Sequence, residues 1–378
     1  MGIVASKDEC CVRLRLEETP KVKFGKAVTE SLRQAISNCD SLHQPIRHSW
    51  LAANHVLPLL QTALPTNPLQ VRREEFHGTP DNGTVAVDWI GDAKLQDSSH
   101  ICLCFPGIGT SATVGFTSKI AHYLAAKLEP GFAVGVVVLQ GFDGLQLRSK
   151  RVISTAALST DDVGFLLEHV AEKYPRRTQV IVGCSIGAAF FTRWAASNQD
   201  RCARCNVVGA ICMAHGHDVY HAQEATDSPL PNEYILGCFK DTLKRCNANE
   251  ELLQSVEGFD LNSLRNAKTI RAWDRAALPL YGFTSYEAML EASDTGTVLH
   301  KLRIPIVWIN SNNDPVAPAT RIFDECGVLE KVPNSIAVRT MLGSHLAYWE
   351  GSIFSMEQEW ACSAMRDLVS AMGTLPRG

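Results

Sequence analysis

The sequence lacks the features that would place it in several common classes of protein. No apolar stretch reaches the roughly 18 residues that a membrane-spanning helix requires, and we expect no secretory signal because no suitable apolar segment is present. The net charge is only −4, which gives no reason to expect a nucleic-acid partner. With 46% apolar and 20% charged residues, the composition is that of an ordinary globular protein with a sizeable core.

Paired cysteine motifs are also scarce. The 13 cysteines are scattered and odd in number, and many lie in apolar, strand-like runs, as Cys102, Cys104, Cys184 and Cys212 do. This distribution is typical of free cysteines in a reducing compartment. Cys202 and Cys205 form a lone C-x-x-C without a second pair, so we favour no zinc site there and expect neither a metal nor a cofactor.

The order of apolar runs predicts an α/β fold. Strands alternate with helices from about residue 84 to 213, which is typical of a mostly parallel central sheet with helices on both faces. The pattern then changes to charged and helical pieces without a clear strand. We therefore predict an α/β core at 71–214 and 300–378, interrupted by a helical cap insertion at 215–299. A helical segment at 31–70 precedes the core, and residues 1–30 form an anchor segment.

The region around Ser185 predicts a nucleophile elbow. An apolar run at 180–182 reads as a buried strand, Gly183 and Gly187 flank Ser185 in a G-x-S-x-G motif, and helix-compatible residues follow. In this context the serine sits at the tip of a strained turn, and the glycines allow strand and helix to pass closely. The alternative is a simple turn in which Ser185 caps the helix.

Two later strand ends supply the other groups of a catalytic triad. Asp314 follows the apolar strand at 304–309, and His345 follows the strand at 336–340. The chain order Ser, Asp, His is the order expected of an α/β-hydrolase. His345 would accept the proton of Ser185, and Asp314 would orient and stabilise the imidazole. Alternative acids and bases, which lie one strand too early, are Asp218, Asp260, His215 and His217.

The loop after the strand at 100–105 is the candidate site of the oxyanion hole. Its small residues at 106–111 precede a helix, and we assign the two oxyanion donors to the backbone N–H groups of Ile108 and Ile186. The alternative is an ordinary turn with a helix N-cap at Thr110 or Ser111. In the insertion and at the core residue just before it, apolar side chains either line an acyl pocket or, for most of them, fill the insertion's own core: Met213, Phe239, Trp273, Leu278, Tyr281, Phe283 and Met289.

The first residues suggest lipidation. They fit the pattern M-G-x-x-x-[ST], which predicts a myristoyl group on Gly2 in a eukaryotic source. One myristoyl chain binds membranes only marginally, with K of about 10⁴ M⁻¹, so palmitoylation of Cys10 or Cys11 would be the second signal. We therefore expect a lipid-anchored protein at the cytoplasmic face of a membrane. The alternative is a chain that begins with Met-Gly by chance.

Motifs along most of the chain from about residue 54 resemble one branch of the α/β-hydrolases. They are Asn54-His55, Gln61-Thr62, Pro80-Asp81, Asp88-Trp89, Pro106-Gly107-Ile108, Gly183 to Gly187, Trp273-Asp274, Gly282-Phe283, Ala292-Ser293, Asn313-Asp314-Pro315 and Gly343 to Leu346. The chain is similar to the YheT / embryogenesis-associated branch, which includes animal membrane phospholipases and yeast medium-chain ester synthases. The resemblance implies a lipid or acylglycerol ester as substrate.

Three functions are compatible with these residues. The triad favours a serine hydrolase that cleaves carboxylic esters, with lipid esters at a membrane surface implied by the resemblance and the anchor motif. An acyltransferase would use the same acyl-enzyme and resolve it with an alcohol. A membrane-tethered scaffold without turnover is the third, and a complete triad argues against it.

Overall fold

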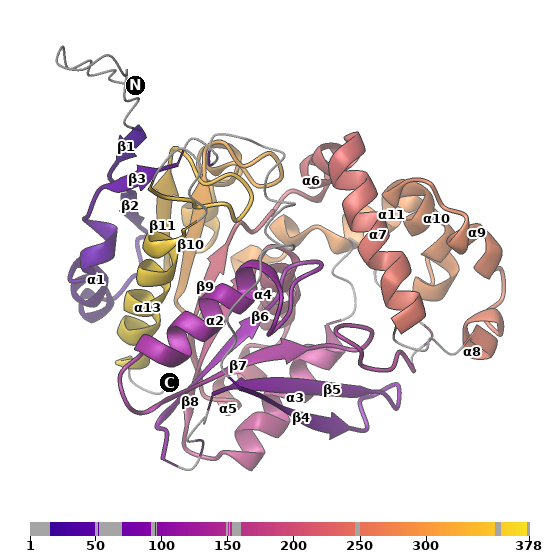
Figure 1. The fold of residues 1–378 in the computed structure, drawn as a ribbon, viewed down its shortest axis with the longest axis horizontal. Coiled ribbons are helices and arrows are strands. Elements are labelled where there is room, and N and C mark those ends of the chain that lie inside the picture. The colour runs from indigo at the N-terminus through magenta and orange to yellow at the C-terminus, as the bar shows by residue number, and fades with distance from the viewer. Residues whose placement is uncertain are drawn as a thin grey trace.

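The computed structural model describes residues 16–49, 52, 70–91, 95, 97–148, 150, 152, 160–245, 250–351 and 357–375. Its centre is a nine-stranded sheet with the order β2-β11-β10-β9-β8-β6-β7-β5-β4 (Figure 1). The strands from β11 to β7 in this order are parallel, whereas β2 pairs antiparallel with β11 at one edge, and β5 pairs antiparallel with both β7 and β4 at the other. The predicted mostly parallel sheet is therefore confirmed, with antiparallel edges added.

The strands of this sheet are β2 (Lys21–Phe24), β4 (Val71–His77), β5 (Thr84–Ile90), β6 (His100–Phe105), β7 (Phe132–Val138), β8 (Thr178–Cys184), β9 (Val207–Met213), β10 (Ile306–Ser311) and β11 (Ser335–Thr340). The helices beside it are α1 (Glu30–Ser37), α2 (Gly115–Lys127), α3 (Asp161–Lys173), α4 (Ile186–Ser197), α5 (Gln199–Arg204), α12 (Val328–Lys331) and α13 (Glu359–Gly373). The central strands are buried on both faces, which explains their continuous apolar runs.

Helices cover both faces of the sheet, as predicted. One face packs against α1, α2 and α13, and its core includes Val182 and Met365. The opposite face packs against α3, α4, α5 and α12, with Ile181 and Trp308 in its core. Alternate residues of one strand thus point into two different cores, as the pleat of a β-strand requires.

In the described residues between β9 and β10, six α-helices form a lobe beside the sheet (Figure 1). They are α6 (Val219–Thr226), α7 (Pro229–Arg245), α8 (Glu250–Gln254), α9 (Leu261–Arg265), α10 (Ile270–Tyr281) and α11 (Tyr286–Ser293). Polar residues cap the N-termini of several of these helices. The side-chain oxygens of Thr269 at α10 and Ser285 at α11 each accept a hydrogen bond from a backbone N–H of the first turn. The lobe has its own core, which includes Phe239 and Trp273.

The N-terminal segment differs from the helical segment predicted for 31–70. Within the described stretch up to residue 49, α1 and a short 3₁₀ turn at Asp40–Leu42 are helical, and Ile46–His48 forms strand β3, which pairs with β1 (Leu16–Glu18). Pro45 disfavours helical backbone at the residue before it and cannot continue a helix, so an extended strand follows. Most of 50–69 lies outside the described residues.

Two glycines allow the close approach of β8, α4 and β6. A Cβ on Gly183 would lie 2.6 Å from Ala188 Cα, in the first turn of α4. A Cβ on Gly187 would lie 2.4 Å from the carbonyl oxygen of Phe105, at the end of β6. The predicted crowding of strand and helix is confirmed at Gly183, whereas at Gly187 the crowding partner is the neighbouring strand.

We expect Gly187→Ala to lower the free energy of unfolding by about 1–3 kcal/mol, because a backbone oxygen must move to admit the methyl group. Gly237→Ala is the matched control, since Gly237 is exposed on α7 and nothing lies within 4 Å of its added Cβ. The control should gain up to about 1 kcal/mol from helix propensity. Urea denaturation of both variants tests this, and equal effects would contradict it.

Candidate active site

Ser185 lies in the strained turn that a nucleophile elbow requires. It connects β8 directly to α4 with φ of 52° and ψ of −122°, a backbone conformation that costs a non-glycine residue about 1–3 kcal/mol. Its backbone N–H donates to the carbonyl of Met213, at 2.9 Å, at the end of β9. This conformation and this hydrogen bond hold the serine at the carboxyl end of the sheet.

The side chains of Ser185, His345 and Asp314 meet at this edge. Ser185 Oγ lies 2.8 Å from His345 Nε2, and His345 Nδ1 lies 3.0 Å and 3.1 Å from the two carboxylate oxygens of Asp314. Hydroxyl, imidazole and carboxylate therefore form one continuous hydrogen-bonded line. Such a line allows the imidazole to accept the serine proton and the carboxylate to stabilise the resulting imidazolium.

The surroundings of Asp314 fix the direction of its carboxylate. Its side chain is fully buried, and Oδ1 also accepts the backbone N–H groups of Val316 and Ala317 at 2.8 Å and 2.9 Å. These two bonds come from the turn that follows β10. Since both the turn and the histidine hold the carboxylate, it cannot rotate away from His345 without losing buried hydrogen bonds.

The loop that carries His345 has unusual backbone geometry. Ser344 and Leu346, on either side of the histidine, have φ of 44° and 66°. Gly343 has φ of 147°, and a Cβ there would lie 2.5 Å from the ring of Tyr348, which is buried beneath the loop. Burial, together with the nearby Asp314 charge, raises the pKa of Tyr348, so the phenol stays neutral.

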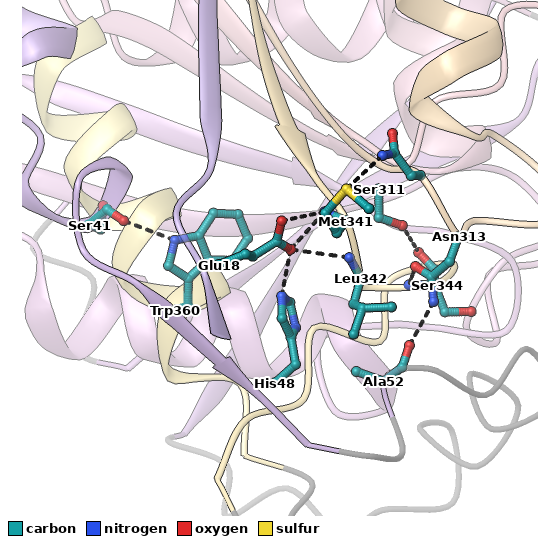
Figure 2. Close-up of polar contacts among 11 residues, drawn as sticks. Glu18, Ser41, His48, Ala52, Ser311, Asn313, Met341, Leu342, Ser344 and Trp360 are labelled. Carbon is teal, nitrogen blue, oxygen red and sulfur yellow. Dashed lines mark hydrogen bonds and ion pairs between the residues drawn. The ribbon is translucent and has the colours of Figure 1, made fainter. Parts of the chain in front are cut away.

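Contacts from distant parts of the chain hold this loop (Figure 2). Asn313 Oδ1 accepts the N–H of Ser344 at 2.8 Å, and Ser311 Oγ donates to the carbonyl of Ser344 at 3.1 Å. Glu18, from β1, accepts the N–H groups of Met341 and Leu342. Nothing in the sequence marks Glu18 as part of the site, because its partner Met341 lies 323 positions away and no local pattern relates the two.

The loop after β6 lies directly against the nucleophile. A Cβ on Gly107 would be 3.5 Å from Ser185 Cβ, and the next residue, Ile108, packs between the sheet core and the core of the helical lobe. Ile186 is the first residue of α4, so its N–H has no partner within the helix. The assignment of these two N–H groups to an oxyanion hole stays a prediction.

The alternative acids and bases cap helices, form an ion pair or pack in the core. Asp218 caps α6 and forms an ion pair with Arg321, and Asp260 caps α9. His215 and His217 are fully buried, with their rings against Trp308. The imidazole that reaches Ser185 is that of His345.

Several other residues that the sequence offers as candidates are buried and pack within the protein. Phe239 and Trp273 are buried in the lobe's core and Met289 in a smaller cluster beside it, so these three fill the lobe itself.

Burial raises the pKa of both Cys202 and Cys205 to about 12, which disfavours the thiolates a metal would need. Over the described ranges, no cluster of three or more metal-ligating side chains is found.

The lipidation residues Gly2, Cys10 and Cys11 lie outside the described residues, as do Asn54-His55 and Gln61-Thr62. Among the helices that the structure describes, none is both long and apolar enough to cross a bilayer.

Comparison with known proteins confirms the resemblance. Phospholipase ABHD3 of Homo sapiens is 24% identical over 330 residues, which cover 85% of this chain and 78% of that protein. Embryogenesis-associated protein EMB8 of Picea glauca is 22% identical over 341 residues, covering 87% and 72%. Monoacylglycerol lipase ABHD2 of Homo sapiens is 22% identical over 332 residues, covering 82% and 75%. No family model matches the chain.

Solved structures confirm the α/β-hydrolase fold. A hyperthermophilic esterase from Pyrobaculum calidifontis superimposes with a TM-score of 0.51 at 14% sequence identity. The match covers 92% of this chain and 98% of that structure.

The two buried histidines, His215 and His217, make the folded protein less stable as the pH falls. Burial lowers the pKa of His215 to about 3, and the pKa of His217 is lowered as well, so both rings are neutral in the folded protein. In the unfolded chain they bind protons below about pH 6.5. Their contribution to stability is thus complete above pH 6.5 and is lost as the pH falls toward the folded pKa.

We expect His217→Phe to flatten the fall in unfolding free energy between about pH 6.5 and pH 4.5, by up to about 1.4 kcal/mol per pH unit. Urea denaturation at several pH values measures the slope. His300→Gln, which replaces an exposed histidine, is the control. An unchanged slope in His217→Phe would show that this ring is not the group that titrates.

Proposed function

We propose that this chain, which has the α/β-hydrolase fold, is a serine hydrolase that cleaves carboxylic esters of lipids. The observation that carries the proposal is the continuous line from Ser185 Oγ through His345 to the buried Asp314. The relatives named a phospholipase and a monoacylglycerol lipase support a lipid ester as the substrate class.

The proposed reaction proceeds in two halves. Ser185 Oγ attacks the ester carbonyl while its proton moves to His345 Nε2, and Asp314 stabilises the imidazolium. The tetrahedral intermediate, whose oxyanion would bind the N–H groups of Ile108 and Ile186, collapses as Nε2 protonates the leaving alcohol. A water molecule, deprotonated by the same nitrogen, then attacks the acyl carbonyl. The bond to Ser185 Oγ breaks as Nε2 returns the proton to that oxygen, and the carboxylic acid is released. The His345 side chain is 20% exposed, so solvent has access to the general base.

Ser185→Ala should abolish ester hydrolysis, with kcat lowered by about 10⁶-fold, and should remove labelling by a fluorophosphonate probe. The matched control is Ser255→Ala, because the Ser255 hydroxyl is exposed on the helical lobe and donates to the carbonyl of Leu252 in α8. Hydrolysis of short- and medium-chain esters and of acylglycerols measures the effect. An active Ser185→Ala variant would contradict the proposal.

Two outcomes of the same assay would favour a function other than ester hydrolysis. Ester products that accumulate when an alcohol is added would indicate acyl transfer from the same acyl-enzyme. A folded wild-type chain that neither hydrolyses esters nor reacts with the probe would favour a scaffold without turnover.

We further propose that the protein acts at the cytoplasmic face of a membrane, anchored by a myristoyl group on Gly2 and a palmitoyl group on Cys10 or Cys11. The support is the Met-Gly pattern at the start of the sequence. A single chain would give only weak binding, which is why the nearby cysteines complete the anchor.

Gly2→Ala should move the protein from the membrane fraction to the soluble fraction and abolish incorporation of a myristate analogue. Metabolic labelling and fractionation of cells measure both effects. Retention of the variant on membranes would contradict the anchor.

A further inference from the structure

The N-terminal segment places a carboxylate against the loop that carries His345 (Figure 2). Glu18 is the last residue of β1, and its two carboxylate oxygens each lie 2.7 Å from the N–H of Met341. One of these oxygens also accepts the N–H of Leu342 at 3.2 Å. These N–H groups belong to the residues that immediately follow β11, at the start of the histidine loop.

The third partner of this carboxylate is a buried histidine. His48 Nε2 lies 2.7 Å from Glu18 Oε1, the His48 side chain is 1% exposed and the Glu18 side chain is 15% exposed. A carboxylate so far removed from solvent needs this full set of partners to offset its desolvation. The arrangement therefore fixes the carboxylate, and the carboxylate in turn fixes two consecutive peptide groups of the loop.

Two other described parts of the N-terminal segment contact β11 and the loop that carries Asp314. β2 extends the sheet by pairing with β11, in the register Lys21 with Arg339 and Phe24 with Ile336. Further along, the carbonyl of Ala52 accepts a bond of 2.8 Å from Asn313 Nδ2, the side chain that also holds Ser344. One segment thus contacts the loops of both the proposed base and the proposed acid.

We propose that Glu18 is a positioning residue for the reaction, which holds the histidine loop so that His345 Nε2 remains in hydrogen-bond reach of Ser185. This inference rests on the proposed function. The loop has left-handed backbone at Ser344 and Leu346, on both sides of the histidine, and such a loop keeps its shape only when outside contacts impose it. Glu18 supplies these contacts at the loop's first two residues.

The catalytic consequence follows from the geometry of proton transfer. A base displaced by about 1 Å from its reacting partner can cost a reaction about 100-fold in rate. Without the Glu18 carboxylate, the N–H groups of Met341 and Leu342 lose their acceptor and the loop is free to relax. The expected effect is on the chemical step, because Glu18 acts through the position of His345, the base that accepts the proton of Ser185.

The experiment compares Glu18→Ala with wild type in ester hydrolysis and in fluorophosphonate labelling. We expect kcat and the rate constant of labelling to fall by about 10- to 100-fold, with KM unchanged. Glu18→Gln keeps one acceptor oxygen for the backbone N–H groups and should fall between the two. Glu17→Ala is the matched control: its neighbouring carboxylate contacts Arg47 at 3.5 Å on the exposed side of β1, and this variant should behave as wild type.

The labelling time course separates positioning from a purely structural role. If Glu18 only stabilises the fold, Glu18→Ala lowers the amplitude of labelling while the folded molecules react at the wild-type rate, and the inference is overturned. It is also overturned if the rate constants of wild type and Glu18→Ala agree. A wild-type chain that the probe does not label would instead contradict the proposed function, so the two failures are distinguishable.

Discussion

The hydrogen bonds from Asp314 through His345 to Ser185 exist only because the carboxyl ends of β8, β10 and β11 lie along one edge of the sheet. Parallel pairing in the order β11-β10-β9-β8 brings these ends together, although the residues that follow them are far apart in the chain. The alignment of three loops is thus a property of the sheet as a whole. A change of register in any of these strands would separate the imidazole from one of its partners.

Strand positions in the core follow closely from the sequence, because strands buried on both faces must be apolar throughout. β6 occurs at the predicted residues 100–105, β11 begins one residue before the predicted 336–340, and β10 is shifted by two residues from the predicted 304–309. The N-terminal strands could not be found this way. β2 alternates exposed Lys21 and Lys23 with half-buried Val22 and Phe24 over four residues only, and its stability comes from pairing with a strand at the other end of the sequence.

The same distinction separates the site residues that the sequence predicts from those that it does not. Ser185, Asp314 and His345 each follow an apolar strand, so the pattern that reveals the strand also reveals the residue. Glu18 and His48 lie in short polar strands, and no spacing relates them to the loop after β11. Their importance depends on a contact in three dimensions, which a single sequence does not encode in any local motif.

The pairing of β2 with β11 also sets the order in which the molecule can be completed during synthesis. Glu18 leaves the ribosome 323 residues before Met341, a delay of about 15–60 s at typical elongation rates. During that interval the first strands have no partner in the sheet, and their closure is among the most non-local contacts of the chain. The nascent protein therefore carries an open sheet edge until β11 emerges, so the active site is assembled only after that strand and the histidine loop behind it have been synthesised.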